Sequence, residues 1–332
     1  MRRIASPAVI LGLILNAIAL GPAALAASHD ARVARVVRHP DPLDRRIRIW
    51  SVPTRHSGPF SITTGPDGNL WFTEQYASKI GRVTTSGQFA EFAIPTLDSS
   101  PYGIVTGPDQ ALWFTETSSG KVGRVQTNGE MTEYSVGSNP QGIALGPDGA
   151  LWLGNLGCIQ RVTIEGYVTR YTVPWVHSWP QAIATGADGA LWFTDPHANM
   201  IGRVTVDGQF SSWQAGDLGI GLVLGPNGAL WFTTDASDAN AIGSITTGGG
   251  ISYYAVDSSP WGIAVGPSGN DLWFPMYSTN QIGRLSTTGR TTAFDVPHRG
   301  PRDGPMGIAT GPDNALWFTE PNGNHIGRIS AR

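Results

Sequence analysis

The chain has one cysteine, few charged residues and, after its first residues, no long hydrophobic run. Because Cys158 is alone among 332 residues, no disulfide can form within the chain, and stability must come from packing. A lone cysteine of this kind is more often a small buried hydrophobe than a nucleophile. Charged residues make up 14% of the chain and its formal net charge is −3. This balance argues against nucleic acid as the main partner.

Helical periodicity is also absent after residue 26. The segments there are short runs of β-branched and aromatic residues, and the turns between them use many of the 43 glycines and 24 prolines. A hydrophobic content of 40% is too high for a disordered chain. We therefore predict an all-β fold.

The one long apolar stretch lies at the start of the chain. Two arginines precede it, and it ends in the small-x-small cleavage pattern Ala24-Leu25-Ala26. We predict a signal peptide over residues 1–26, and hence a secreted, periplasmic or cell-envelope protein with no membrane span after cleavage. A membrane anchor is the alternative, and the two prolines that interrupt the stretch disfavour it.

What the chain does have is one phrase in seven near-copies. The phrase reads G-P-D-G-x-L-W-F-T-E, then I-G-R-V, then a glycine turn and an aromatic-rich run. Its tryptophans recur every 39 to 44 residues, at Trp71, Trp113, Trp152, Trp192, Trp231, Trp273 and Trp317. A period of this size made of short strands indicates a radial repeat array. We predict a seven-bladed β-propeller of four-stranded antiparallel blades over residues 45–332, with these tryptophans in the core between blades.

The two ends of the chain are expected to share a blade. The last copy ends after its third strand, at residues 326–329, and has no fourth strand of its own. Residues 47–53 resemble the fourth strands of the other copies. The N-terminal segment should therefore complete the seventh blade and close the ring. Residues 27–44, which precede it, are predicted to be a flexible arm.

The arginine of the I-G-R phrase recurs in six of the seven copies, and Ser244 replaces it in the fifth. Six arginines at one strand position could form a basic ring for an anionic partner. We favour the alternative that each pairs with an acid or carbonyl within its own blade.

A binding site is expected at the mouth of the central channel, on the face where the connections between blades vary. The residues after each loop proline position should line this mouth: Phe60, Tyr102, Gln141, Gln181, Ile220, Trp261 and Met306. The set is mostly aromatic or apolar, which suits an apolar small molecule or a peptide. We expect a monomer that binds such a ligand there.

Polar residues also gather on this face. His56 and His298 fall in neighbouring connections between blades. The second strands of copies 1, 2 and 7 end in the acids Glu74, Glu116 and Glu320. A histidine and a carboxylate near a channel mouth can act as a base and a metal ligand. The alternative is that they are solvated loop residues and capping acids of the repeat, and His325 is expected at the surface.

The repeat phrase, the copy number and the closing strand resemble the virginiamycin B lyases, also called streptogramin B lyases. Residues 70–74 and 79–82 are close to the blade consensus of that family, and the resemblance extends over residues 47–328. It implies a magnesium-dependent carbon–oxygen lyase that opens a cyclic depsipeptide antibiotic by elimination. In that chemistry a histidine removes a proton alpha to a carbonyl, and the ester carboxylate leaves from the neighbouring carbon. The metal and its carboxylates stabilise the developing charge.

The residues that the resemblance makes functional are largely replaced. Where the family has Pro-His at the first strands of blades 6 and 7, this chain has Trp261 and Met306 after the proline. The glutamate that precedes the second of these prolines is replaced by Gly304. At the mouth of blade 1, Phe60 replaces a tyrosine. Losing both histidines removes the base of the family, so we predict a propeller that binds a ligand or partner.

An active enzyme is the alternative, either a divergent lyase or another metal-assisted protein that acts on esters or lactones. Its catalytic candidates are His298 and His56. Its candidate magnesium ligands are Glu320, which matches the carboxylate at the end of the second strand of blade 7 with an offset of about one position, and Asp303.

Overall fold

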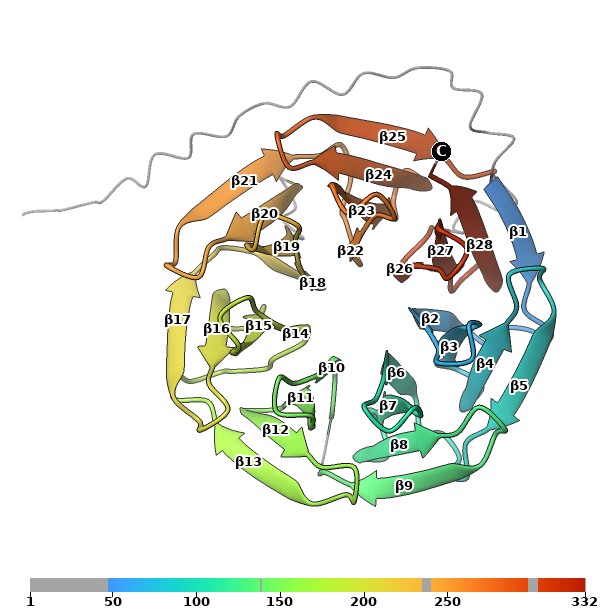
Figure 1. The fold of residues 1–332 in the computed structure, drawn as a ribbon, viewed down its shortest axis with the longest axis horizontal. Helices are drawn as coiled ribbons and strands as arrows, with labels where there is room; N and C mark the ends of the chain where they lie inside the picture. The colour runs from blue at the N-terminus through green and yellow to red at the C-terminus, as the bar shows by residue number, and fades with distance from the viewer. Residues whose placement is uncertain (1–46, 138, 235–239, 298–303, 332) are drawn as a thin grey trace, which may run out of the picture. The chain divides into compact units, whose positions relative to one another are not determined.

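The computed structural model describes residues 47–137, 139–234, 240–297 and 304–331. These residues form seven antiparallel sheets of four strands, and Figure 1 shows the sheets as blades around a central axis. The predicted all-β, seven-bladed propeller is confirmed. The predicted signal peptide and N-terminal arm lie outside the described residues.

Blades 1 to 6 are built from the axis outward in chain order, and blade 7 takes its outermost strand from the start of the described chain. The first, innermost strands are β2 (Pro59–Thr64), β6 (Pro101–Thr106), β10 (Ile143–Leu145), β14 (Ile183–Thr185), β18 (Leu218–Leu224), β22 (Ala264–Val265) and β26 (Ile308–Thr310). The second strands carry the tryptophans and are β3 (Leu70–Glu74), β7 (Leu112–Glu116), β11 (Leu151–Asn155), β15 (Leu191–Asp195), β19 (Leu230–Thr234), β23 (Asp271–Met276) and β27 (Ala315–Glu320).

The outer half of each blade contains the I-G-R strand and the aromatic-rich strand. The third strands are β4 (Lys79–Val83), β8 (Lys121–Val125), β12 (Cys158–Val162), β16 (Met200–Val204), β20 (Ala241–Ile245), β24 (Gln281–Ser286) and β28 (His325–Ser330). The fourth are β5 (Phe89–Ala93), β9 (Met131–Ser135), β13 (Val168–Thr172), β17 (Phe210–Gln214), β21 (Ile251–Ala255), β25 (Thr291–Asp295) and, in blade 7, β1 (Ile47–Ser51).

The closing strand of the ring is the N-terminal one, as predicted. Strand β1 pairs antiparallel with β28 from Ile47 opposite Ile329 to Ser51 opposite His325. In Figure 1 the blue start of the described chain therefore lies beside its red end. Trp50 of β1 stacks on Trp317, with ring centroids 5.4 Å apart, so the two ends also share a packed core. Blade 7 is thus complete only when both ends of the chain are in place.

The blade tryptophans fill the space between neighbouring sheets. Six of the seven are fully buried, and the seventh, Trp273, is 3% exposed. Each stacks on an aromatic residue of the fourth strand in its own blade, as Trp113 does on Tyr134 at 5.6 Å. Rings of this size bury enough apolar area to hold sheets that could not be stable alone. Cys158 is also buried, as expected.

The arginines of the I-G-R phrase pair within their own blades, so the basic-ring alternative is not needed. In blade 2, Asp109 accepts a hydrogen bond from Trp113 Nε1 at 3.0 Å and another from Arg124 Nε at 2.5 Å. Blade 5 replaces both charged partners together. Its turn carries Asn227, which accepts the Trp231 Nε1 hydrogen bond at 2.9 Å, and Ser244 stands in place of the arginine. Because the Asn227 amide is neutral, it does not require an arginine to balance its charge.

Within the described residues, the structure contains no helix of the length and apolar character that a membrane span requires.

Candidate functional site

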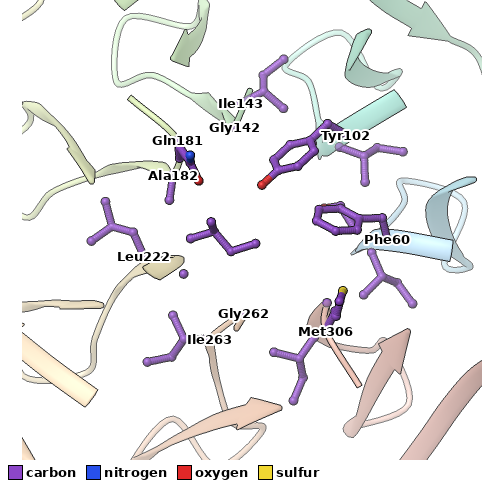
Figure 2. A pocket seen from close by; sticks show the side chains of 18 of the residues that line it. Phe60, Tyr102, Gly142, Ile143, Gln181, Ala182, Leu222, Gly262, Ile263 and Met306 are labelled. Carbon is purple, nitrogen blue, oxygen red and sulfur yellow. The ribbon is translucent and has the colours of Figure 1, made fainter. Parts of the chain in front are cut away.

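The mouth of the channel opens into a cavity of about 190 Å³ around the propeller axis. Residues from the first strands and the connections before them line it, and Figure 2 shows their side chains. Five of the seven predicted mouth residues line this cavity: Phe60, Tyr102, Gln181, Ile220 and Met306. The other two, Gln141 and Trp261, are not among its lining residues; Gln141 is 5% exposed, and the neighbouring Gly142 and Gly262 line the cavity.

Four aromatic rings form a row of successive contacts, and two of them, Phe60 and Tyr102, line the cavity. The centroids of Phe60 and Tyr102 are 4.6 Å apart, and Figure 2 shows the two rings side by side. Phe60 also meets Trp261 edge-on, at 6.5 Å and an interplanar angle of 85°. Trp261 in turn contacts Tyr277 at 5.9 Å. Burial raises the pKa of the Tyr102 phenol, so its hydroxyl stays neutral and serves as a hydrogen-bonding group.

Tyr277 is the member of this row that the sequence analysis missed. It follows the last residue of β23, in the connection between the second and third strands of blade 6, where we predicted no site residue. Its hydroxyl accepts a hydrogen bond from Asn322 Nδ2 of blade 7 at 2.7 Å. The sequence offered one signal for this role, which is that a tyrosine directly follows an apolar second strand. The signal is weak because the residues after Tyr277 are typical of turns, where a tyrosine is usually exposed.

The positions of the two family histidines hold bulky side chains that take part in this apolar mouth. Trp261 belongs to the aromatic row, and in Figure 2 the Met306 side chain points toward Phe60. Gly304 stands where the resemblance implies a glutamate, and the space beside it is filled by atoms of Tyr277. A Cβ added at Gly304 would collide with the carbonyl oxygen of Tyr277. The backbone at this point therefore has no room for an acidic side chain.

Of the predicted catalytic residues, only His56 can be placed. It is exposed, in the connection that leads into blade 1, and its backbone is left-handed with φ 55°. Next to it, the backbone N–H of Ser57 donates to Asn324 Oδ1 at 2.8 Å. This bond ties the connection to blade 7. His298 and Asp303 lie outside the described residues.

The predicted acids end their strands as expected, but they are buried beneath the connections. Glu74 and Glu116 are fully buried, and desolvation raises the pKa of each to about 7. The nearby carboxylate of Glu91 adds to the rise at Glu74, and that of Glu133 adds to the rise at Glu116. Near neutral pH each of these acids is therefore close to the midpoint of its titration, inside the fold.

Glu320 is likewise only 1% exposed, and its Oε2 lies 3.3 Å from Nδ1 of His325. His325 is the first residue of β28 and is 9% exposed, so its predicted surface position is wrong. The reason is that Ser51 of the closing strand pairs with it and covers the end of the blade.

The two predicted magnesium ligands are not brought together among the described residues, because Asp303 lies outside them. Within the described part of the chain, no three side chains of His, Cys, Asp or Glu converge. Glu320 faces a histidine nitrogen, whereas Mg²⁺ prefers a shell of oxygen ligands.

Comparisons with known proteins agree with this geometry. The model of the virginiamycin B lyase family matches residues 16–217 and 214–332. The virginiamycin B lyase of Bacillus licheniformis is 45% identical over 42 residues, which span 13% of this chain and 14% of that protein.

Solved structures match over much more of the chain. A streptogramin B lyase is 32% identical with a TM-score of 0.78, and the match covers 86% of this chain and 97% of that one. A catalytically inactive histidine-to-alanine variant of virginiamycin B lyase from Staphylococcus aureus, solved with quinupristin, is 30% identical with a TM-score of 0.79 and coverages of 86% and 99%. With its blade phrase, its closing strand and nearly its full length matched, the chain belongs to the virginiamycin B lyase family.

Proposed function

We propose that this protein binds an apolar, ring-bearing ligand at the channel mouth and does not open it. The observation that carries the proposal is the aromatic row of Phe60, Tyr102, Trp261 and Tyr277, whose first two rings line the cavity. Flat rings and a neutral phenol recognise apolar faces and leave no charged group to be desolvated. Cyclic depsipeptides of the streptogramin B type are the first ligands to test, because a relative has been solved with quinupristin.

Loss of turnover follows from the residues that replace the reactive ones. The relative bound to quinupristin is inactive after a single histidine is changed to alanine. In this chain Trp261 and Met306 stand at the histidine positions of the family, and neither side chain can accept a proton. Gly304 stands where the family has an acid, and the Tyr277 backbone closes that space.

Binding and turnover can be measured on the same samples. We expect calorimetry to show quinupristin binding to the mature protein, and chromatography with mass detection to recover the ligand unchanged after long incubation with Mg²⁺. Elimination would give an isomer of unchanged mass and altered retention, whereas hydrolysis would add one water.

A matched pair of variants locates the site. Phe60→Ala removes the ring that contacts two others and should weaken binding by roughly tenfold or more, in line with the loss of one buried aromatic contact. Tyr167→Ala removes an aromatic side chain that is 75% exposed in a turn of blade 3, and should leave binding unchanged. Equal affinity of wild type and Phe60→Ala would overturn the proposed site.

The alternative function is a divergent lyase or another metal-assisted enzyme acting on esters or lactones. The histidines of the connections, His56 and His298, would have to supply its base, and Asp303 with Glu320 its magnesium ligands. Turnover that requires Mg²⁺ and disappears in His298→Ala would establish this alternative and reject ours.

We also propose that the protein acts outside the cytoplasm, in the periplasm, the cell envelope or the medium, and as a monomer. The support for export is the signal-like sequence of residues 1–26. Fractionation of cells and the N-terminal sequence of the mature protein test it.

A further inference from the structure

In four of the seven blades, a buried threonine near the end of the second strand bonds to two blades at once. In blade 1, Thr73 Oγ1 accepts the backbone N–H of Ser61 at 3.0 Å and donates to the carbonyl oxygen of Tyr102 in blade 2, also at 3.0 Å. One hydroxyl therefore bridges the first strands of two neighbouring blades. We call this arrangement a threonine relay.

Four blades contain the complete relay. Besides Thr73, the relays are Thr115 from Gly103 to Gln141, Thr233 from Gly221 to Trp261, and Thr319 from Gly307 to Phe60. All four threonines are fully buried. Three of the four relays end on the backbone of an aromatic mouth residue: Tyr102, Trp261 and Phe60.

Two blades show what happens without the hydroxyl. Their second strands have Gly154 and Pro275 at the threonine position. There the first strands bond directly, from Gly142 N–H to the Gln181 carbonyl at 2.7 Å and from Gly262 N–H to the Met306 carbonyl at 3.0 Å. The mouth residues at these two junctions are not aromatic. The hydroxyl is therefore a spacer, and neighbouring first strands meet directly where it is missing.

We infer that Thr73, Thr233 and Thr319 are positioning residues, which set the backbone position from which the three mouth rings project. A buried carbonyl or N–H that loses its partner costs about 1–3 kcal/mol, so the junction would move to recover the bond. Without the hydroxyl, we expect the neighbouring strands to shift toward the direct geometry seen at Gly142 and Gln181. Such a shift would displace the ring without removing any atom of it.

Trp261 is the most direct reporter of this displacement, because Thr233 Oγ1 donates to the carbonyl oxygen of Trp261 at 3.0 Å. We propose fluorine NMR of the mature protein labelled with 5-fluorotryptophan, with the Trp261 resonance assigned by Trp261→Phe. Thr233→Val keeps the shape of the side chain and removes the hydroxyl. We expect it to shift the Trp261 resonance and to leave that of Trp152, on another blade, in place.

Two controls separate positioning from general damage to the fold. Thr233→Ser keeps the hydroxyl and should return the Trp261 resonance to its wild-type position. Thr194→Val changes the equivalent threonine of blade 4, which accepts the Ala182 N–H at 3.1 Å but, among the described residues, does not bond to the next mouth residue. It should leave Trp261 unshifted. An unshifted Trp261 in Thr233→Val, or a Thr233→Ser protein that behaves like Thr233→Val, would overturn the inference.

For ligand binding, the inference rests on the proposed function, and quinupristin is the probe. We expect Thr233→Val to weaken its binding by roughly tenfold, the effect of about one hydrogen bond, and Thr233→Ser to restore it. If wild type binds no quinupristin while the resonance still shifts, the proposed function fails and the positioning role stands. If wild type binds it and Thr233→Val binds equally well, the positioning role fails and the proposed function stands.

Discussion

At the scale of single residues, the buried acids depart most from their expected role. Glu74 and Glu116 end their strands at the channel-mouth face, where acids could act as bases or ligands. Instead they lie fully buried beneath the connections. In blade 2, Ser119 Oγ donates to Glu116 Oε2 at 2.9 Å, and burial raises the pKa of this acid to about 7. Such an acid makes stability depend on pH.

The direction of this pH dependence follows from the raised pKa of Glu116. The folded state holds its proton up to about pH 7, whereas the unfolded chain releases it near the ordinary value of 4.5. The stability gained from the buried neutral acid is therefore fully present below about pH 4.5 and is lost as the pH rises through about 7. A single carboxyl whose pKa differs this much between the folded and unfolded states lowers the free energy of unfolding by up to about 3 kcal/mol at pH 8.

Glu116→Gln keeps an acceptor for Ser119 and cannot ionise. We expect it to be less stable than, or equal to, wild type at about pH 5 and more stable by up to about 3 kcal/mol at about pH 8, measured by urea unfolding at both pH values. Glu130→Gln, an exposed acid in a turn of the same blade, should show no such crossover. Parallel pH profiles for wild type and Glu116→Gln would contradict the burial argument.

The sequence allowed the identities of the mouth residues to be predicted better than their surroundings. Phe60, Tyr102 and Met306 line the cavity because each follows the same loop position in its blade. The burial of Glu320 and His325 could not be foreseen, because it depends on how side chains and connections pack at the strand ends, which the repeat pattern does not specify. The same holds for Tyr277, since its part in the row depends on contacts with Trp261 and Asn322 of other segments.

At the scale of the element, the blade explains why so much of the architecture could be predicted. Five copies repeat the Asp–Trp–Arg contacts, and where blade 5 loses the arginine it also loses the acid. A pattern that recurs seven times averages out local ambiguity, so strand order and turn positions follow from the repeat alone. The connections that vary between blades carry no such pattern, and their side-chain positions could not be predicted in the same way.

The closing strand β1 is the element on which the ring depends most. A chain that starts after Ser51 would lose the pairing with β28 and the stacking of Trp50 on Trp317. We expect its Tm to fall by roughly 10 °C or more relative to a chain that starts at Ile47, because the edge of blade 7 and its tryptophan become exposed. Circular dichroism melting of the two proteins measures this difference. Equal Tm values would rule out a closing role for β1.

At the scale of the whole molecule, scaffold and site have diverged within one family. The blade phrases, the closure and the fold are those of the streptogramin B lyases, with a solved member at 32% identity. At the positions where the resemblance implies histidines, however, this chain has Trp261 and Met306, and at the position implied for the acid it has Gly304, where a Cβ would collide with the Tyr277 carbonyl oxygen. A scaffold held together by packing between blades can keep its shape while the few side chains at its mouth change.

A crystal structure of the mature protein, grown with Mg²⁺ and soaked with quinupristin, shows directly whether the mouth binds the ligand without opening it. We expect an intact ring of the ligand, with its apolar face on Phe60, Tyr102 and Trp261. A ligand opened at its ester, or one seated away from these rings, would contradict this expectation.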